Sequence, residues 1–285
     1  MKRALLIALL AMTSACGRPD ARSVAAPPGD APRVVTLAPH LAELVASAGA
    51  LDVLVGVSAY SDYPHAVTAI PVVSDGFRID AEALLNVRPT LVLAWGGGGQ
   101  ASSRALLEAL GVPVLEVPGR TLADIPQALR MIGAALDVAD AAETAAQRFE
   151  ADIDALGFSG EVLDVFYEIN SQPLYTVGGG HFISELIELC GGANIFAELT
   201  TAAPAVSLEA VVLRDPQVIL TTSNADAPEQ TIWQRWPQLR AVQGNNVLSI
   251  PGDLVARPSV RLAKGGVAVC DALADARMRA ALDQL

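Results

Sequence analysis

Apolar positions along the chain follow two periods, one typical of buried strands and one typical of amphipathic helices. Short runs rich in β-branched residues predict strands at 33–37, 53–58, 90–95, 112–117 and 161–169. Apolar residues three or four positions apart predict helices at 41–49, 79–87, 101–110 and 182–190, a surface helix at 232–239 and closing helices within 262–285. Strands that alternate with helices of this length indicate parallel sheets with crossover helices.

The clearest amphipathic stretch is 139–157, where apolar residues recur at helical spacing. Asp140, with Glu143 three residues later, predicts a capping box at its start, and Gly157 predicts its end. Such a helix is about 25 Å long. A continuous helix of this length resists bending, so we expect only small movements of the segments that it connects.

An internal repeat flanks this helix. Residues 79–93 match 206–220, with Glu82 equivalent to Glu209 and a proline seven residues after each, and 114–119 match 247–252. The sequence therefore predicts an α/β protein of two Rossmann-like lobes with parallel sheets, joined by one long bridging α-helix. The expected domains are an N-terminal lobe at 33–138, the bridging helix at 139–157 and a C-terminal lobe at 158–285. A ligand is expected in the cleft between the lobes.

The N-terminus has the pattern of an export signal at 1–16: a basic start, an apolar core and small residues before Cys16. Cys16 resembles the lipid-modified cysteine of bacterial lipoproteins, although Thr13 stands where leucine is usual. Ordinary cleavage nearby is the alternative. Residues 17–32, rich in Pro, Ala and Gly, predict a flexible tether. The predicted location is the periplasm, with a lipid anchor on the membrane.

Net charge and cysteine count narrow the picture further. A formal charge of -12 disfavours nucleic acid and anionic membrane surfaces as partners. If Cys16 carries lipid, Cys190 and Cys270 remain as an even pair in an oxidising compartment, and we predict a disulfide. Closing a loop of about 80 residues contributes about 4 kcal/mol on the chain-entropy argument. Two buried free thiols are the alternative.

Several segments together resemble the iron-chelate and cobalamin class of substrate-binding proteins that supply ABC importers. They are Val-Ser-Ala-Tyr-Ser-Asp-Tyr-Pro at 57–64, residues 89–95, Cys-Gly-Gly-Ala-Asn-Ile-Phe at 190–196, and Arg257-Pro258 followed by Arg261. The 57–64 loop and the paired cysteines are most similar to the cobalamin-binding members. The resemblance implies a monomer that catalyses no reaction, holds no resident cofactor, binds one corrinoid per chain and docks on an ABC importer permease.

By position, the resemblance implies that Tyr60, Trp95, Tyr175 and Asp253 face the ligand. Aromatic rings would cover the apolar corrin edges, and polar groups would bond its amide arms. The alternatives are core packing for the aromatics and a turn role for Asp253.

Three tryptophans expected in this class are missing here. Phe77 follows Gly76 where one is expected, and we include Phe77 among the ligand-binding candidates; Ala203 and Leu254 stand near the other two. Fewer stacking surfaces leave haem or a ferric siderophore open as the alternative ligand.

The resemblance also gives a role to the repeated glutamates. In this class such residues form salt bridges with arginines of the permease, so Glu82 and Glu209 are the predicted docking residues. Charge pairing of this kind governs docking rate and orientation. A solvated first-turn carboxylate, favoured by the helix dipole, is the alternative for each.

Two other functions compete. Residues 96–101 fit Gly-x-Gly-x-x-Ala, with Glu116 at the end of the next predicted strand, a pattern of dinucleotide-dependent enzymes. The export signal opposes it, and a tight mobile loop is the preferred interpretation. Metal capture would need convergent ligands. His40, His65 and His181 lack such spacing, so we predict no metal site, although His40 and His181 are expected on loops that face the cleft. A hydrolase is disfavoured, because no Gly-x-Ser-x-Gly occurs.

Overall fold

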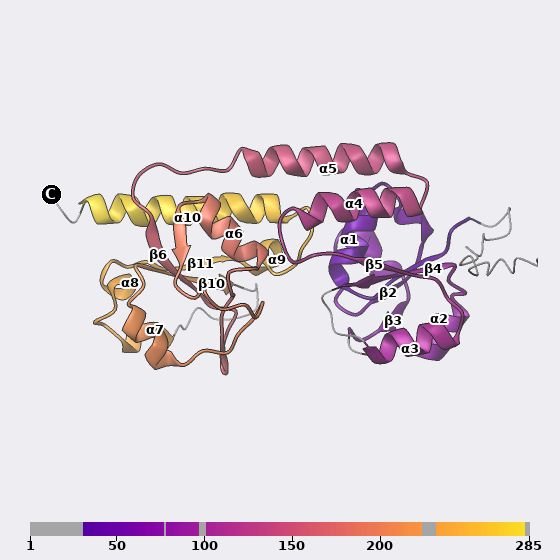
Figure 1. Ribbon diagram of the computed structural model, residues 1–285, viewed down its shortest axis with the longest axis horizontal. Helices are drawn as coiled ribbons and strands as arrows, with labels where there is room; N and C mark the ends of the chain where they lie inside the picture. Colours follow the sequence, from indigo (N-terminus) through magenta and orange to yellow (C-terminus); the bar gives the residue numbers. More distant parts are fainter. Residues whose placement is uncertain (1–30, 77, 97–100, 224–231, 283–285) are drawn as a thin grey trace, which may run out of the picture. The chain divides into compact units, whose positions relative to one another are not determined.

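The computed structural model describes residues 31–76, 78–96, 101–223 and 232–282 (Figure 1). The predicted signal peptide, most of the tether, Cys16 and Phe77 lie outside these residues. Two parallel sheets form the framework, which confirms the predicted fold class. The first sheet has the order β3 (Val72–Ser74), β2 (Leu54–Ser58), β1 (Val34–Thr36), β4 (Leu91–Trp95) and β5 (Val114–Val117). The second has the order β11 (Val247–Pro251), β10 (Val218–Ser223), β6 (Leu163–Tyr167) and β9 (Gly192–Asn194).

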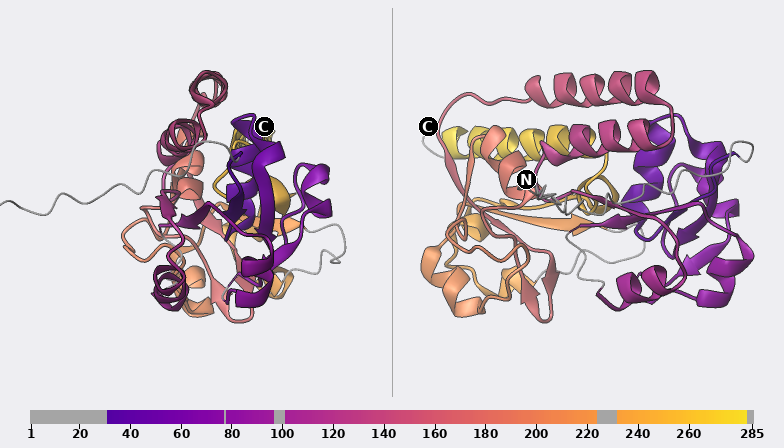
Figure 2. Two further views of the ribbon diagram at one scale, coloured as in Figure 1. Left: turned by 90° about the vertical axis from the view of Figure 1, so that its right-hand side faces the viewer. Right: turned by 45° about the vertical axis from the view of Figure 1, so that its right-hand side comes forward.

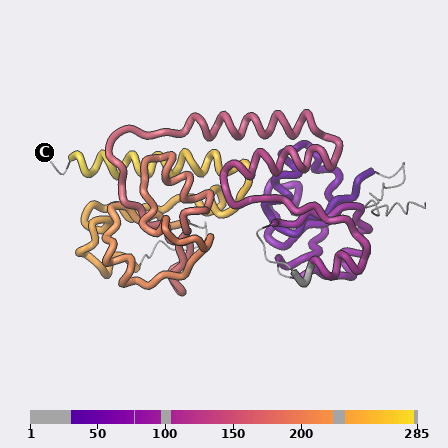
Figure 3. The backbone as a smooth tube through the Cα atoms, in the orientation of Figure 1, coloured from indigo at the N-terminus to yellow at the C-terminus, as the bar shows by residue number. Residues whose placement is uncertain are grey.

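Helices surround each sheet, and we call the segment from β1 to α4 the first lobe and that from β6 to α10 the second lobe. The first lobe contains α1 (Pro39–Ser47), α2 (Ala81–Asn86), α3 (Ala101–Ala109), α4 (Asp124–Ala135) and the 3₁₀ turns η1 (Leu51–Val53) and η2 (His65–Ala69). The second contains α6 (Phe182–Leu189), α7 (Leu208–Arg214), α8 (Arg240–Gln243), α9 (Gly252–Val255), α10 (Leu262–Leu282), η3 (Ile232–Arg235) and the hairpin β7 (Asn170–Ser171) with β8 (Leu174–Tyr175). Figure 3 traces the chain from the first lobe through α5 (Ala139–Asp154) to the second.

The repeat predicted from the sequence has a structural counterpart. The sheets align as β1, β4 and β5 with β6, β10 and β11, and α2 corresponds to α7. Asp80 caps α2 and Ser207 caps α7, each by accepting a backbone N–H of the first turn. Arg88 and Asp215, which precede the repeated prolines, both have positive φ, at 43° and 45°. The repeat therefore includes the helix start and the turn into the next strand.

Helix α5 starts at the predicted residue and ends at Asp154, earlier than the predicted Gly157. It contacts α4 of the first lobe and α10 of the second (Figure 1). The predicted capping box is wrong, because Val138 is the N-cap residue and Glu143 instead accepts a bond from Arg130 of α4, with Nε and Oε2 2.7 Å apart. Close packing of α4 on α5 depends on Gly133, where an added Cβ would lie 2.3 Å from a side-chain atom of α5.

Two further predictions near the end of the chain need correction. The expected surface helix at 232–239 is the short turn η3, and Trp233 within it is fully buried. Its Nε1 donates to Glu168 Oε2 at 2.5 Å, a partner from the end of β6. The closing segment is one continuous helix, α10. No described helix is long and apolar enough to cross a membrane.

Both lobes contribute to one apolar core. The largest cluster of buried side chains includes Leu41 of α1, Leu129 of α4, Phe149 of α5, Leu186 of α6 and Val269 of α10. The predicted disulfide between Cys190 and Cys270 is confirmed, and it ties the end of α6 to α10. The bridging helix thus packs on an apolar layer shared by the two sides.

Candidate functional site

The loop after β2 presents Tyr60 to solvent. Its side chain is 80% exposed and its φ is 65°, a conformation that is costly for a tyrosine. The loop is held by Arg257 of the second lobe, which donates to the Tyr60 carbonyl at 2.9 Å and to Asp62 Oδ1 at 2.6 Å. The bond from Arg257 also holds the pKa of Asp62 below its usual value. The backbone of the loop that carries the exposed ring is thus held by a contact between lobes.

Trp95 ends β4 at the same junction. The imidazole of His40 packs against it edge-on, with ring centroids 5.3 Å apart. Gly119 leaves room for the indole, because a Cβ added there would lie 3.0 Å from Trp95 Nε1 and 3.2 Å from Pro258 Cγ. Trp95 therefore lies at a point where the first lobe approaches the 257–261 segment of the second.

Asp253 lies in the first turn of α9, directly after β11, and is mostly exposed. Its Oδ2 accepts a bond from Arg261 Nη1 at 3.1 Å. The carboxylate is therefore oriented by an arginine and remains accessible to a partner.

A buried carboxylate, Glu43, connects these residues. Its side chain in α1 is fully inaccessible and accepts bonds from Arg257 Nη1 at 3.1 Å, Ser259 Oγ at 2.6 Å and Arg261 Nη2 at 2.9 Å. The same arginines hold the Tyr60 loop and Asp253. Glu43 of the first lobe thus positions groups on both lobes, and we call Glu43, Arg257, Ser259 and Arg261 the interlobe cluster.

Sequence reasoning quoted Arg257 and Arg261 as family residues but missed Glu43. The available signal was a charged residue inside the apolar run of 41–45, since a carboxylate in such a position is rarely buried unless it is paired.

A second hydrogen bond joins the lobes: Glu185 of α6 accepts the backbone N–H of Leu122 at 2.7 Å.

The remaining ligand-site predictions are not brought together with this group. Tyr175 lies in β8, half-buried, and pairs through its backbone with Ala205 and Ile169. Among the described residues, no polar or ring contact joins its side chain to Tyr60, Trp95 or Asp253. Phe77 and residues 97–100 of the glycine-rich segment lie outside the described residues.

Of the two histidines expected on loops, one lies inside a helix and the other ends the loop that leads into α6. His40 is in α1 and 4% exposed; burial first, and then the charge of Arg257, lowers its pKa to about 3. His181 caps α6 by accepting the Ile183 N–H at Nδ1, and burial lowers its pKa to about 4. Both are neutral at physiological pH. No group of three or more metal-binding side chains occurs within the described residues.

The predicted docking residues occupy matched positions. Glu82 and Glu209 are exposed in the first turns of α2 and α7. Both helices lie on the side of the sheets away from α5 in two views (Figures 1 and 2). Exposed apolar side chains accompany them: Leu85 of α2 is 52% exposed and Leu213 of α7 is 87% exposed. Each lobe therefore offers a carboxylate beside an apolar residue on the same side.

The chain belongs to the periplasmic binding protein family, whose profile matches residues 34–254. Its members are substrate-binding proteins rather than enzymes. Among curated proteins, the chain is similar to the vitamin B12-binding protein of Vibrio cholerae serotype O1, with 35% identity over 271 residues that cover 93% of this chain and 96% of that protein.

Solved structures of periplasmic binding proteins also resemble this chain. The periplasmic vitamin B12 binding protein BtuF of Vibrio cholerae superposes with a TM-score of 0.77 at 32% identity, over 87% of this chain and 98% of that one. A periplasmic heme binding protein from Pseudomonas aeruginosa superposes with a TM-score of 0.72 at 22% identity, over 84% and 91% of the two chains. The second likeness shows the shared fold alone.

Proposed function

We propose that this protein captures cobalamin, or a closely related corrinoid, between its lobes in the periplasm and delivers it to an ABC importer. The observation that carries the proposal is the grouping of Tyr60, Trp95 and Asp253 around the interlobe cluster. The near full-length similarity to vitamin B12-binding proteins supports it. One ligand binds per monomeric chain, and no resident cofactor takes part.

The chemistry of these residues suits a large, flat, amide-rimmed ligand. The partly exposed rings of Tyr60 and Trp95 offer apolar faces to the corrin edge. The exposed carboxylate of Asp253 accepts hydrogen bonds from amide side arms, and Arg261 orients it. Tyr175 and Phe77 remain proposed ligand contacts on family position alone.

A titration followed by the corrin absorption band tests the ligand. Cobalamin or cobinamide should shift the band and saturate at one equivalent. Trp95→Ala should weaken binding by about tenfold, since losing a stacked aromatic costs about 1 kcal/mol or more. Trp236→Ala in the second lobe is the matched control and should bind normally. A spectral response to haem or a ferric siderophore, with none to either corrinoid, would replace cobalamin as the ligand.

Glu82 and Glu209 are the proposed docking contacts with arginines of the permease. Their equivalent, exposed positions in the two lobes support this, since paired contacts would orient both lobes at once. Glu82→Lys with Glu209→Lys should abolish uptake while leaving ligand affinity intact, and Glu108→Lys on exposed α3 is the control. Uptake that survives the double reversal would remove the docking role without affecting the ligand assignment.

Lipid attachment at Cys16 is the proposed anchor, with residues 1–15 removed on export so that Cys16 becomes the new N-terminus. It rests on the sequence pattern before Cys16. In cell fractionation the protein should sediment with membranes, and Cys16→Ser should release it to the periplasmic fraction. Equal distribution of both forms would contradict the anchor and leave export itself in place.

A further inference from the structure

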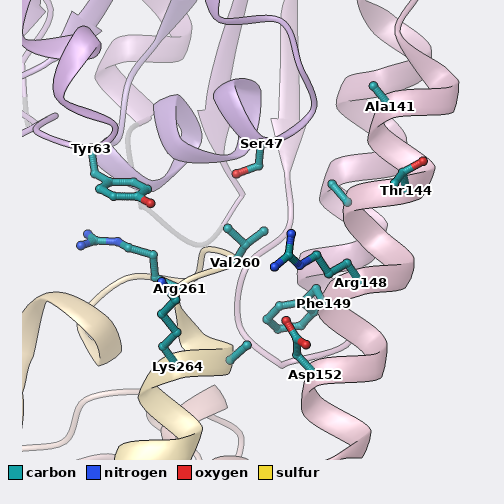
Figure 4. Close-up of a pocket in the computed structure, with 12 residues that line it drawn as sticks. Ser47, Tyr63, Ala141, Thr144, Arg148, Phe149, Asp152, Val260, Arg261 and Lys264 are labelled. Atoms are coloured by element: carbon teal, nitrogen blue, oxygen red, sulfur yellow. The ribbon is translucent and has the colours of Figure 1, made fainter.

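A cavity of about 450 Å³ lies behind the interlobe cluster, against the bridging helix. Its walls come from three parts of the chain: Ser47 and Tyr63 of the first lobe, α5, and the start of α10 (Figure 4). Tyr60, Trp95, Tyr175 and Asp253 are not among its lining residues. The cavity thus shares Arg261 with the interlobe cluster but none of the four candidate ligand residues, and its volume is within the range of small-molecule sites.

Positive charge is concentrated in this cavity although the whole chain carries a formal charge of -12. Arg148 of α5, Arg261 and Lys264 line it, against one carboxylate, Asp152. The charge of Arg261 is already matched by Glu43 and Asp253. The side chains of Arg148 and Lys264 form no hydrogen bond or ion pair within the described part of the chain. Two cations thus remain available to a ligand.

The side chain of Arg148 points into the cavity, which supports its availability to a ligand (Figure 4). Asp152 lies four residues later on the same helix, the spacing at which arginine and aspartate commonly pair. In Figure 4, however, Arg148 extends across the cavity toward Val260 of the opposite wall. Its guanidinium is therefore placed over the cavity with its donors unused.

Most of the remaining lining is apolar, beside the hydroxyl groups of Ser47 and Thr144. Ala145 and Val260 are partly exposed there, whereas Phe149 and Ala263, at 3% and 6% exposed, offer little surface. The ring of Tyr63 closes one side, held over the Arg261 guanidinium with 4.6 Å between the charged carbon and the ring centroid. An apolar wall beside two free cations matches a ligand with an anionic head and an apolar body.

We propose that this cavity is a second binding site, which takes a small organic anion consisting of a carboxylate or phosphate group on an apolar body. Arg148 and Lys264 bind the anionic group by charge-assisted hydrogen bonds. Tyr63, Ala145 and Val260 contact the apolar body. This inference does not depend on the identity of the transported ligand.

Calorimetric titration of the intact protein with four probes tests the site. Phenyl phosphate and benzoate combine a ring with an anion and distinguish the phosphate from the carboxylate source. Inorganic phosphate lacks the ring, and phenol lacks the charge. At least one ring-bearing anion should bind at one equivalent, and both partial probes should bind more weakly. Failure of both ring-bearing anions to bind at millimolar concentration would overturn the proposal.

Two variants locate the binding. Arg148→Gln and Lys264→Gln should each weaken the ring-bearing anion by about tenfold, as expected for a lost charge-assisted bond. Arg235→Gln, at an exposed arginine in η3, is the matched control and should bind normally. If both cavity variants bind phenyl phosphate and benzoate as tightly as wild type does, the anion binds elsewhere and the assignment is overturned. Circular dichroism of each variant checks that the fold is retained.

Discussion

The two lobes repeat one structural unit but differ most where they meet. Away from the junction, α2 and α7 keep the same cap position, the same exposed glutamate and the same left-handed turn before a proline. At the junction, the first lobe supplies the carboxylates Glu43 and Asp62, and the second supplies Arg257 and Arg261. The two lobes are therefore alike on the side proposed to dock and carry opposite charges where they contact each other.

Replacing Glu43 with alanine should have the largest effect on this asymmetric junction. It leaves two partly buried arginines without their shared carboxylate, and breaking a buried ion pair from one side costs about 3 to 5 kcal/mol. Chemical unfolding should show a loss of this size. Glu143→Ala removes an exposed carboxylate that also pairs with an arginine, Arg130, and is the control expected to change little. Equal losses in the two variants would show that the junction is no more than a surface ion pair.

The disulfide is a second difference between the lobes, since both of its cysteines belong to the second lobe. Replacing Cys190 and Cys270 together with serine should lower stability by about 4 kcal/mol on the chain-entropy argument. Thermal unfolding of the oxidised wild type, the reduced wild type and the double variant measures this. A melting temperature that is the same for all three would mean that the bond contributes nothing to the folded second lobe.

The repeat and most strands were predictable because their signals are local. Apolar runs specify β4 and β10, and the caps of α2 and α7 lie beside the residues that they satisfy. Helix α4 was not predicted, since Pro126 and Gly133 are poor helix formers and its packing depends on α5. The capping box failed for the same reason, because Arg130 of α4 engages Glu143.

The candidate site was predictable only in part. The family resemblance named Tyr60, Trp95 and Asp253, which lie close to one cluster in the structure. It did not name Glu43, the residue that connects them. Glu43 binds partners more than 200 positions away, with separations of 214 and 218 residues to the two arginines. No local pattern indicates such a pairing. Buried Trp233 was missed likewise, as its partner Glu168 is 65 residues distant.

A buried histidine should give the first lobe a dependence on acid. The pKa of His40 is lowered to about 3 from 6.5, so below pH 6.5 the unfolded chain binds a proton that the folded protein excludes. The free energy of unfolding is therefore unaffected by this group above pH 6.5 and falls steadily as the pH is lowered from 6.5 toward 3. Between pH 7 and pH 5 this group should cost wild type about 2 kcal/mol.

His40→Phe should remove that part of the pH dependence, since Nε2 has no hydrogen-bond partner in the described residues and the ring can still pack against Trp95. Unfolding free energies of wild type and variant, measured from pH 7 to pH 5, should diverge by about the same 2 kcal/mol. His65→Phe, at an exposed histidine, is the control. Parallel pH profiles for His40→Phe and wild type would contradict burial of a neutral imidazole.

Ligand binding should change the arrangement of the lobes least of all. Helix α5 is continuous over 16 residues, the largest apolar cluster includes residues of both lobes, and Glu43 already joins them without ligand. Small-angle scattering should therefore detect a change of less than about 0.5 Å in a radius of gyration of about 18 Å. Because Glu43 contributes to this restraint, Glu43→Ala should show a larger ligand-dependent change, provided that it remains folded. A large change in wild type would mean that α5 and the interlobe cluster permit hinge motion, and the two lobes would then differ in mobility as well as in charge.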